Sequence, residues 1–216
     1  MMDRKISEII NKNFYEFWKV SNSNKYLYHV LKGGRASAKS THIAFWLTMA
    51  MVKYPVNTVC FRKVGNTIMD SVYEQLKETI EIFGLTHLFQ FKKSPMEIIF
   101  IPRGNKFIFR GLDDPQKIKS IKSAKYPIAF AWFEEVAEIK TEDELSMVIN
   151  SVLRGELPDK LNYKIFLSYN PPKRKQSWVN KKFEIHVLPK NTYVHHSIYL
   201  DNPHISKASY THLTLP

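Results

Sequence analysis

The chain lacks several features that would place it in particular classes of protein. Cys60 is its only cysteine, which excludes a disulfide within the chain and a cysteine-rich metal site. No apolar run approaches the roughly 20 residues that span a bilayer. The first residues lack the apolar core of a secretory signal. These absences argue against a membrane-spanning or secreted protein and indicate an intracellular one.

Acidic residues are also scarce, while the rest of the composition is that of a globular protein. The 216 residues include 20 Asp and Glu against 32 Lys and Arg, for a net charge of +12. This excess favours a polyanionic partner, either nucleic acid or an anionic membrane surface. Charge alone is equally compatible with a basic protein that is merely soluble and has no such partner. Hydrophobic residues make up 44% of the chain, enough for one good core.

The most informative stretch is residues 27–47, where a short apolar strand is followed by small residues and then by a helix. This order is typical of a phosphate-binding loop, in which backbone N–H groups and a helix N-terminus surround phosphate oxygens. Lys39 would reach the outer phosphates, and Ser40 would ligate Mg²⁺. The residues predicted to bind ATP are Gly33, Gly34, Arg35, Ala36, Ser37, Ala38, Lys39, Ser40 and Thr41.

This loop departs from the pattern G-x-x-x-x-G-K-[ST] at its second glycine, where Ala38 stands. Alanine is tolerated there if its φ angle is negative, whereas a positive φ costs about 1 kcal/mol or more. The alternative interpretation is a glycine turn before an amphipathic helix that happens to carry Lys-Ser.

The alternation of predicted strands and helices favours an α/β fold with a mostly parallel central sheet flanked by helices. With the phosphate-binding loop, the expected class is a P-loop NTPase of the ASCE/RecA-like type. The predicted helices are 3–20, 41–53, 68–83 and 145–153, and the predicted strands are 27–33, 57–61, 97–101, 106–110, 126–133, 163–168 and 192–198. Ligands of such sheets bind at the carboxyl ends of the strands.

Two acidic residues directly follow the apolar strand 126–133. Glu134 would hold Mg²⁺ opposite the phosphate-binding loop, as the Walker B carboxylate does. Glu135 would point toward the attacking water and orient or deprotonate it. The alternative is that both acids mark a helix N-terminus, where the dipole favours negative charge. Together with the loop, the pair favours nucleotide hydrolysis.

A third strand ends in Ser168 and Asn170, ahead of two prolines. These side chains could sense the γ-phosphate and pass its loss to a moving part, although for this segment taken by itself an Asn-Pro turn is the better interpretation. The following basic stretch could track a phosphate backbone, and a solvated basic face is the alternative. The candidate DNA-binding residues in it are Lys173, Arg174, Lys175, Lys181 and Lys182.

In order and spacing, these motifs resemble the large terminase subunit of tailed bacteriophages over most of residues 27–203. Its glycine loop usually reads Gly-Gly-Arg-Gly-Ser-Gly-Lys-Ser, and Gly33–Ser40 is similar to it. Residues 110–120 are similar to a block of a subset of the family, 132–136 to its Walker B segment, and 168–172 to its coupling region. The family's large subunit drives DNA into a preformed capsid and carries an N-terminal ATPase domain and a C-terminal nuclease domain.

The resemblance implies roles for individual residues. Lys39, Ser40, Glu134 and Glu135 are expected to bind and hydrolyse MgATP, and Ser168 and Asn170 to couple hydrolysis to DNA movement. Arg35 matches a loop arginine that senses the γ-phosphate in cis. The family inserts a basic residue from a neighbouring subunit; the candidates here for that trans-acting cation are Lys119 and Lys122.

The resemblance also implies the organisation and partners of the chain. We expect an N-terminal helix in residues 1–24, an ATPase domain in 25–200 and, in 201–216, a truncated linker toward a missing nuclease domain, so that no nuclease activity is expected. The implied partners are double-stranded DNA, the portal protein, the small terminase subunit and further copies in a ring, within the host cell cytoplasm. The alternatives are another P-loop DNA translocase or helicase, and a non-catalytic, nucleotide-gated DNA-binding module.

Overall fold

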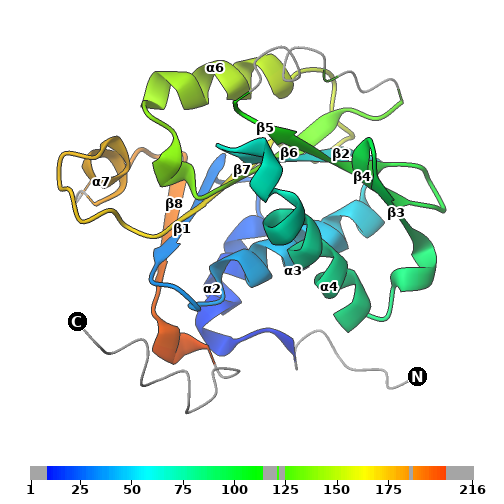
Figure 1. The fold of residues 1–216 in the computed structure, drawn as a ribbon, viewed down its shortest axis with the longest axis horizontal. Coiled ribbons are helices and arrows are strands. Elements are labelled where there is room, and N and C mark those ends of the chain that lie inside the picture. The colour runs from blue at the N-terminus through cyan, green and yellow to red at the C-terminus, as the bar shows by residue number, and fades with distance from the viewer. Residues whose placement is uncertain (1–8, 114–120, 122–124, 185–186, 203–216) are drawn as a thin grey trace.

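A computed structural model describes residues 9–113, 121, 125–184 and 187–202, in which strands and helices alternate (Figure 1). The strands are β1 Tyr28–Gly33, β2 Asn57–Arg62, β3 Phe89–Lys93, β4 Met96–Phe100, β5 Lys106–Gly111, β6 Ile128–Glu134, β7 Lys164–Tyr169 and β8 Thr192–Ser197. The helices are α2 Tyr15–Ser21, α3 Lys39–Lys53, α4 Glu74–Ile82, α6 Glu142–Val152 and α7 Trp178–Phe183.

The described strands form one eight-stranded sheet in the order β3-β4-β5-β2-β6-β7-β1-β8. The pairs from β5 through to β8 are all parallel, whereas β3 and β4 pair antiparallel at one edge. This confirms the predicted α/β fold with a mostly parallel sheet. The carboxyl ends of β1, β2, β6 and β7 therefore meet at one edge of the sheet, which is where ligands of open α/β sheets bind.

Helices cover both faces of the sheet. Successive residues of a strand point to opposite faces, so they pack into different hydrophobic clusters. Val30 belongs to the hydrophobic cluster beneath α6 and α7, while its neighbour Leu31 belongs to the cluster beneath α2, α3 and α4. Figure 1 shows α3 and α4 on one side of the sheet and α6 on the other. Packing on both faces holds in place the strand ends that carry the polar side chains.

Local signals explain where several elements begin and end. The chain leaves α3 at Tyr54, whose extended backbone is the conformation favoured before Pro55. Helix α6 begins after Thr141, whose hydroxyl accepts a hydrogen bond from the backbone N–H of Glu144 at 3.1 Å. The first turn of α6 is entirely acidic, as the helix dipole favours.

The structure corrects three expectations. The helix predicted over 3–20 is not continuous, because Asn11 caps a 3-10 turn before α2 begins at Tyr15, and residues 1–8 lie outside the described part. The helix predicted over 68–83 opens as a π-helix, Met69–Tyr73, before α4. The sequence interpretation also missed β3 and α7. Strand β3 alternates weakly and occupies the sheet edge, and α7 has only six residues, too few to show a helical period.

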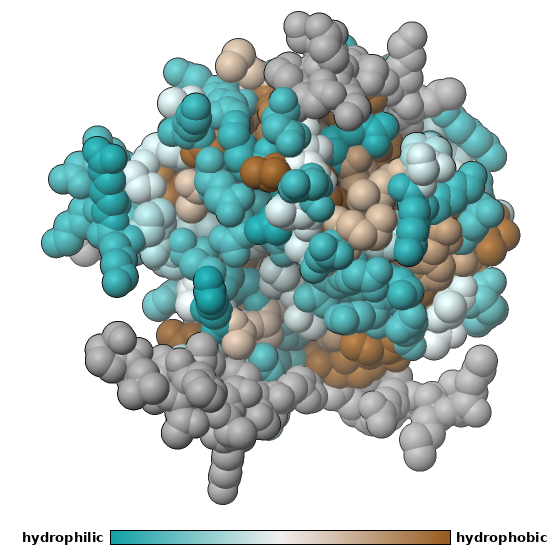
Figure 2. All heavy atoms as spheres, in the orientation of Figure 1, coloured by the Kyte–Doolittle hydropathy of each residue, from teal (hydrophilic) through white to brown (hydrophobic). Residues whose placement is uncertain are grey.

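The surface toward the viewer of Figure 2 is mostly hydrophilic, including a projection in the region of α7. Within the part of the chain that the structure describes, no helix combines the length and apolar character that a membrane crossing requires.

Candidate functional site

The predicted phosphate-binding loop connects β1 to α3, as the sequence indicated. Both alanines that replace glycines of the family pattern adopt left-handed backbone angles, with φ of 58° at Ala36 and 61° at Ala38. The structure therefore takes the costly alternative at Ala38. An alanine held in this region costs about 1–2 kcal/mol relative to its normal conformation, so the remaining contacts of the loop must hold it in place.

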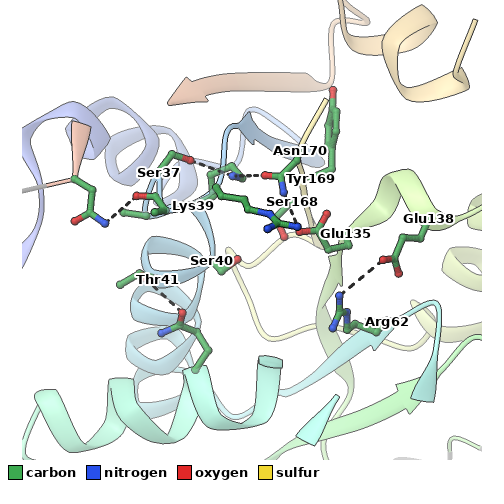
Figure 3. Close-up of a pocket in the computed structure, with 15 residues that line it drawn as sticks. Ser37, Lys39, Ser40, Thr41, Arg62, Glu135, Glu138, Ser168, Tyr169 and Asn170 are labelled. Atoms are coloured by element: carbon green, nitrogen blue, oxygen red, sulfur yellow. Dashed lines mark hydrogen bonds and ion pairs between the residues drawn. The ribbon is translucent and has the colours of Figure 1, made fainter. Parts of the chain in front are cut away.

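The ammonium of Lys39 is enclosed by the loop that precedes it. Its Nζ donates to the carbonyl oxygens of Gly33 at 3.0 Å and Gly34 at 2.7 Å, to the hydroxyl of Ser37 at 3.0 Å and to Oδ1 of Asn170 at 3.1 Å. Burial lowers the pKa of Lys39 to about 8, although the nearby carboxylates oppose the shift. This cation lies at the centre of the site (Figure 3).

Glu134 ends β6 beside the start of α3. The hydroxyl of Ser40 lies 3.4 Å from Oε1 of Glu134, and Nε of Arg62 lies 3.5 Å from Oε2. Burial raises the pKa of the Glu134 carboxyl, and the charge of Arg62 opposes that shift. The structure thus brings together Ser40 and Glu134, the two residues that the sequence predicted as metal ligands.

These two oxygens fit Mg²⁺ by their chemistry. Among the described residues, no group of three or more His, Cys, Asp or Glu side chains is placed to hold a metal ion. Mg²⁺ in nucleotide-binding enzymes does not need such a group, because it takes one or two protein oxygens, phosphate oxygens and water. Among the described residues, the buried Oε2 of Glu134 accepts no hydrogen bond and lies 3.5 Å from Nε of Arg62, which leaves it available to a cation.

Glu135 follows Glu134 in a left-handed conformation, with φ of 51°, and lines a cavity of about 490 Å³. The two successive carboxylates point in different directions: that of Glu134 lies beside Ser40, while that of Glu135 faces the cavity (Figure 3). The amide Nδ2 of Asn170 lies 3.5 Å from Oε1 of Glu135. Glu135, which the sequence predicted would orient an attacking water, thus faces the cavity.

The two predicted coupling residues occupy different environments. Asn170 bridges the site, because its Oδ1 accepts from Lys39 and its Nδ2 approaches Glu135. Ser168 is buried, and its hydroxyl accepts a hydrogen bond from Nε1 of Trp132 at 3.0 Å. Asn170 therefore contacts both charged groups, whereas Ser168 joins β7 to β6 beneath them.

The same cavity includes residues that the sequence interpretation did not assign to the site. Arg62, from the end of β2, pairs with Glu134 and lies 3.9 Å from Glu138. Gln75 lines the cavity from α4 and lies 3.5 Å from the hydroxyl of Thr41. The rule that polar residues at strand ends face the ligand would have found Arg62, but nothing in the sequence links α4 to the loop. The residues that line the cavity are Arg35, Ala36, Ser37, Ala38, Lys39, Ser40, Thr41, Arg62, Gln75, Glu135, Glu138, Ser168, Tyr169, Asn170 and Asn202.

The remaining predicted cations fall into two groups. Lys119 and Lys122 lie outside the described residues. Of the basic residues in and before α7, Lys173, Arg174, Lys175 and Lys181 are exposed. Lys182 instead forms an ion pair with Glu142 and lies over the rings of Tyr28 and Phe183. Its surroundings give it a role in joining α7 to α6 and β1.

Comparison with known proteins identifies the family of this chain. A family model described as "Phage terminase large subunit" matches residues 25–214. A curated relative from Bacillus phage SPP1, "Terminase, large subunit", is 53% identical over 204 residues, covering 94% of this chain and 48% of the relative. A second, the "PBSX phage terminase large subunit" of Bacillus subtilis, is 29% identical over 188 residues, covering 81% of this chain and 42% of the relative. The chain therefore spans about half the length of these relatives.

Among solved structures, the large terminase of a thermophilic bacteriophage in complex with ATP-γ-S is similar, with a TM-score of 0.68 and 18% identity over 94% of this chain and 47% of that one. At this level of identity the likeness shows a shared fold.

Proposed function

Because the chain belongs to the phage terminase large subunit family, we propose that it is the ATPase domain of a DNA-packaging motor, which hydrolyses ATP with Mg²⁺ to translocate double-stranded DNA into a procapsid. One observation carries this proposal. Lys39 and Glu135, which follow the ends of two different strands, line a single cavity with Asn170 between them, and Glu134 lies beside Ser40, which lines the same cavity.

The phosphate-binding loop supplies the binding of nucleotide in this proposal. Lys39, which is already surrounded by acceptors, would exchange carbonyl oxygens for the outer phosphate oxygens. Ser40 and Glu134 would hold Mg²⁺, which when bound would neutralise charge on the phosphates. Arg35 is exposed at the mouth of the cavity, where a guanidinium can reach the γ-phosphate. The residues at positions 33–41 would contribute their backbone N–H groups.

Glu135 is proposed as the residue that orients or deprotonates the attacking water. Its carboxylate faces the cavity, and it lies on a turn that a buried strand holds in place. Asn170 would sense whether the γ-phosphate is present, because its amide group contacts both Lys39 and Glu135. Ser168 would carry a displacement of β7 to β6 through Trp132.

The partners belong to the same proposal. The exposed residues Lys173, Arg174, Lys175 and Lys181 would contact the DNA backbone, and Lys119 or Lys122 would reach a neighbouring subunit's site in a ring. The portal protein and the small terminase subunit are the expected protein partners in the host cell cytoplasm. Binding to a portal would separate this motor from another P-loop translocase or helicase.

ATP hydrolysis by the full chain, with and without double-stranded DNA, tests the proposal. Replacing Glu135 with Gln keeps the size and hydrogen bonding of the side chain but removes its basicity, so turnover should fall at least 100-fold while ATP binding persists. Lys39→Ala should weaken binding itself. Turnover that survives both substitutions would contradict the proposed site.

The left-handed alanines favour one alternative, a nucleotide-gated DNA-binding module without catalysis. Strain at Ala36 and Ala38 makes the loop less stable than a glycine loop. Normal ATP binding together with no turnover, in the presence of DNA and a portal, would establish this alternative.

A further inference from the structure

The end of β8 lies directly against the phosphate-binding loop. Ser197 pairs with Gly33 in the parallel register of β8 and β1. A Cβ atom added to Gly33 would lie 1.8 Å from the carbonyl oxygen of Ser197, and Gly33 has a φ of 154°. A side chain at position 33 is therefore excluded by the backbone of β8, so the first residue of the loop and the last residue of the strand form one packed unit.

A buried hydrogen bond adds to this contact. The hydroxyl of Ser197 donates to Oγ of Ser37 at 3.1 Å, between residues 160 positions apart in the sequence. The exposed fraction is 0% at Ser197 and 1% at Ser37, so water does not compete with this bond.

The hydroxyl of Ser37 is thereby fully used. It donates to the carbonyl oxygen of Gly34 at 2.9 Å and accepts from Lys39 at 3.0 Å and from Ser197. A serine hydroxyl has one donor and two acceptor positions, so each capacity is filled and its rotamer is fixed. The direction in which Ser37 presents a lone pair to Lys39 thus depends on Ser197.

A second contact reaches the loop from the same segment. Nδ2 of Asn202, just beyond β8, donates to the carbonyl oxygen of Ala36 at 2.9 Å. Ala36 is one of the two left-handed alanines. The stretch 197–202 therefore touches the loop at two adjacent residues, one of them strained.

We propose that Ser197 is a positioning residue for nucleotide binding, holding the phosphate-binding loop in its competent conformation through Ser37. The inference rests on the proposed ATP-binding function and extends it to the last strand of the sheet. A loop with two strained alanines relaxes to other conformations when a holding contact is lost. The apparent dissociation constant for nucleotide then rises by the inverse of the fraction that remains competent.

Calorimetric binding of ATP-γ-S with Mg²⁺ to the full chain tests the proposal, in a double-mutant cycle of Ser37→Ala and Ser197→Ala. Ser197→Ala should raise the dissociation constant about five- to tenfold, the equivalent of one lost hydrogen bond, and Ser37→Ala, which loses all three hydrogen bonds of that hydroxyl, should raise it at least as much. The double variant should bind no more weakly than the weaker single variant. Ser197→Thr keeps the hydroxyl on an edge strand that favours threonine, and should bind within twofold of the unaltered chain.

Ser151→Ala is the matched control, because its hydroxyl bonds only within α6, to the carbonyl oxygen of Val148. Its dissociation constant should not change. A dissociation constant for Ser197→Ala within twofold of the unaltered chain would overturn the inference, and so would single effects that multiply in the double variant. If Lys39→Ala loses binding while Ser197→Ala does not, the proposed function stands and this inference fails. An unaltered chain that binds no nucleotide would overturn both.

Discussion

The left-handed alanine at position 36 allows a test of how the loop is held. Ala36 has a φ of 58° and is exposed, so glycine in its place would remove strain without opening a cavity. The strain relieved is about 1–2 kcal/mol, and the greater freedom of glycine in the unfolded chain subtracts about 0.4–1 kcal/mol. We expect Ala36→Gly to stabilise the protein by about 0.5–1 kcal/mol.

Ala38 has the same backbone conformation but a different expected outcome. It is partly buried against the core beneath α3, so glycine there would also remove a packed methyl group. That loss of about 0.8 kcal/mol offsets most of the relief, and Ala38→Gly should change stability little. Ala44→Gly is the control, since Ala44 is fully buried inside α3 and the same exchange should destabilise by about 2 kcal/mol.

Urea unfolding monitored by circular dichroism measures all three variants, with stability compared at an unchanged slope. The expected order of stability is Ala36→Gly, then Ala38→Gly, then Ala44→Gly. An Ala36→Gly variant destabilised as strongly as Ala44→Gly would refute the reasoning, because it would mean that the loop carries no relievable strain at that position.

Three further predictions concern titration and charge. Burial, aided by the charge of Lys164, lowers the pKa of His29 to about 3. His29 is therefore protonated below about pH 6.5 in the unfolded chain but stays neutral in the folded chain down to about pH 3. Stability should be full above about pH 6.5 and fall by about 1.4 kcal/mol per unit toward pH 3; urea unfolding of His29→Asn, lacking this slope, is the check. Because phosphate favours the charged form of Lys39, whose pKa is about 8, the affinity for ATP-γ-S should be independent of pH below 8 and should weaken above it. Calorimetry in buffers of different ionisation enthalpy should show proton uptake on binding near pH 8.5. An affinity that stays constant up to pH 10 would contradict this prediction. DNA affinity should fall steeply with salt, and Lys181→Ala should reduce the slope of log affinity against log salt by about one; an unchanged slope would remove Lys181 from the DNA-binding surface.

Much of the site could be predicted because its chemistry is local in sequence. Lys39 and Ser40 follow one apolar strand, and Glu134 and Glu135 follow another. Since parallel strands end at a common edge, their side chains had to lie near one another. The same rule brings Asn170, which follows β7, to that edge.

What the sequence could not supply were the contacts between distant elements. The hydrogen bond from Ser197 to Ser37 depends on β8 lying beside β1, and the apolar periodicity of either strand does not predict the order of strands in the sheet. The interruption near Asn11 was hidden because apolar residues continue at helical spacing through it. Lys182 was grouped with its basic neighbours, yet its ion pair with Glu142 is set by the packing of α7 against α6.

The place of β7 between β6 and β1 has a geometric consequence. Because neighbouring strands are about 4.8 Å apart, the ends of β6 and β1 stand about 9.5 Å from each other, with Asn170 following the strand between them. This interval keeps the ammonium of Lys39 and the carboxylate of Glu135 from neutralising one another directly. It is narrow enough for the single amide group of Asn170 to contact both side chains. With β1 and β6 adjacent, no strand would end between them, and the amide that now bridges Lys39 and Glu135 would have no place there.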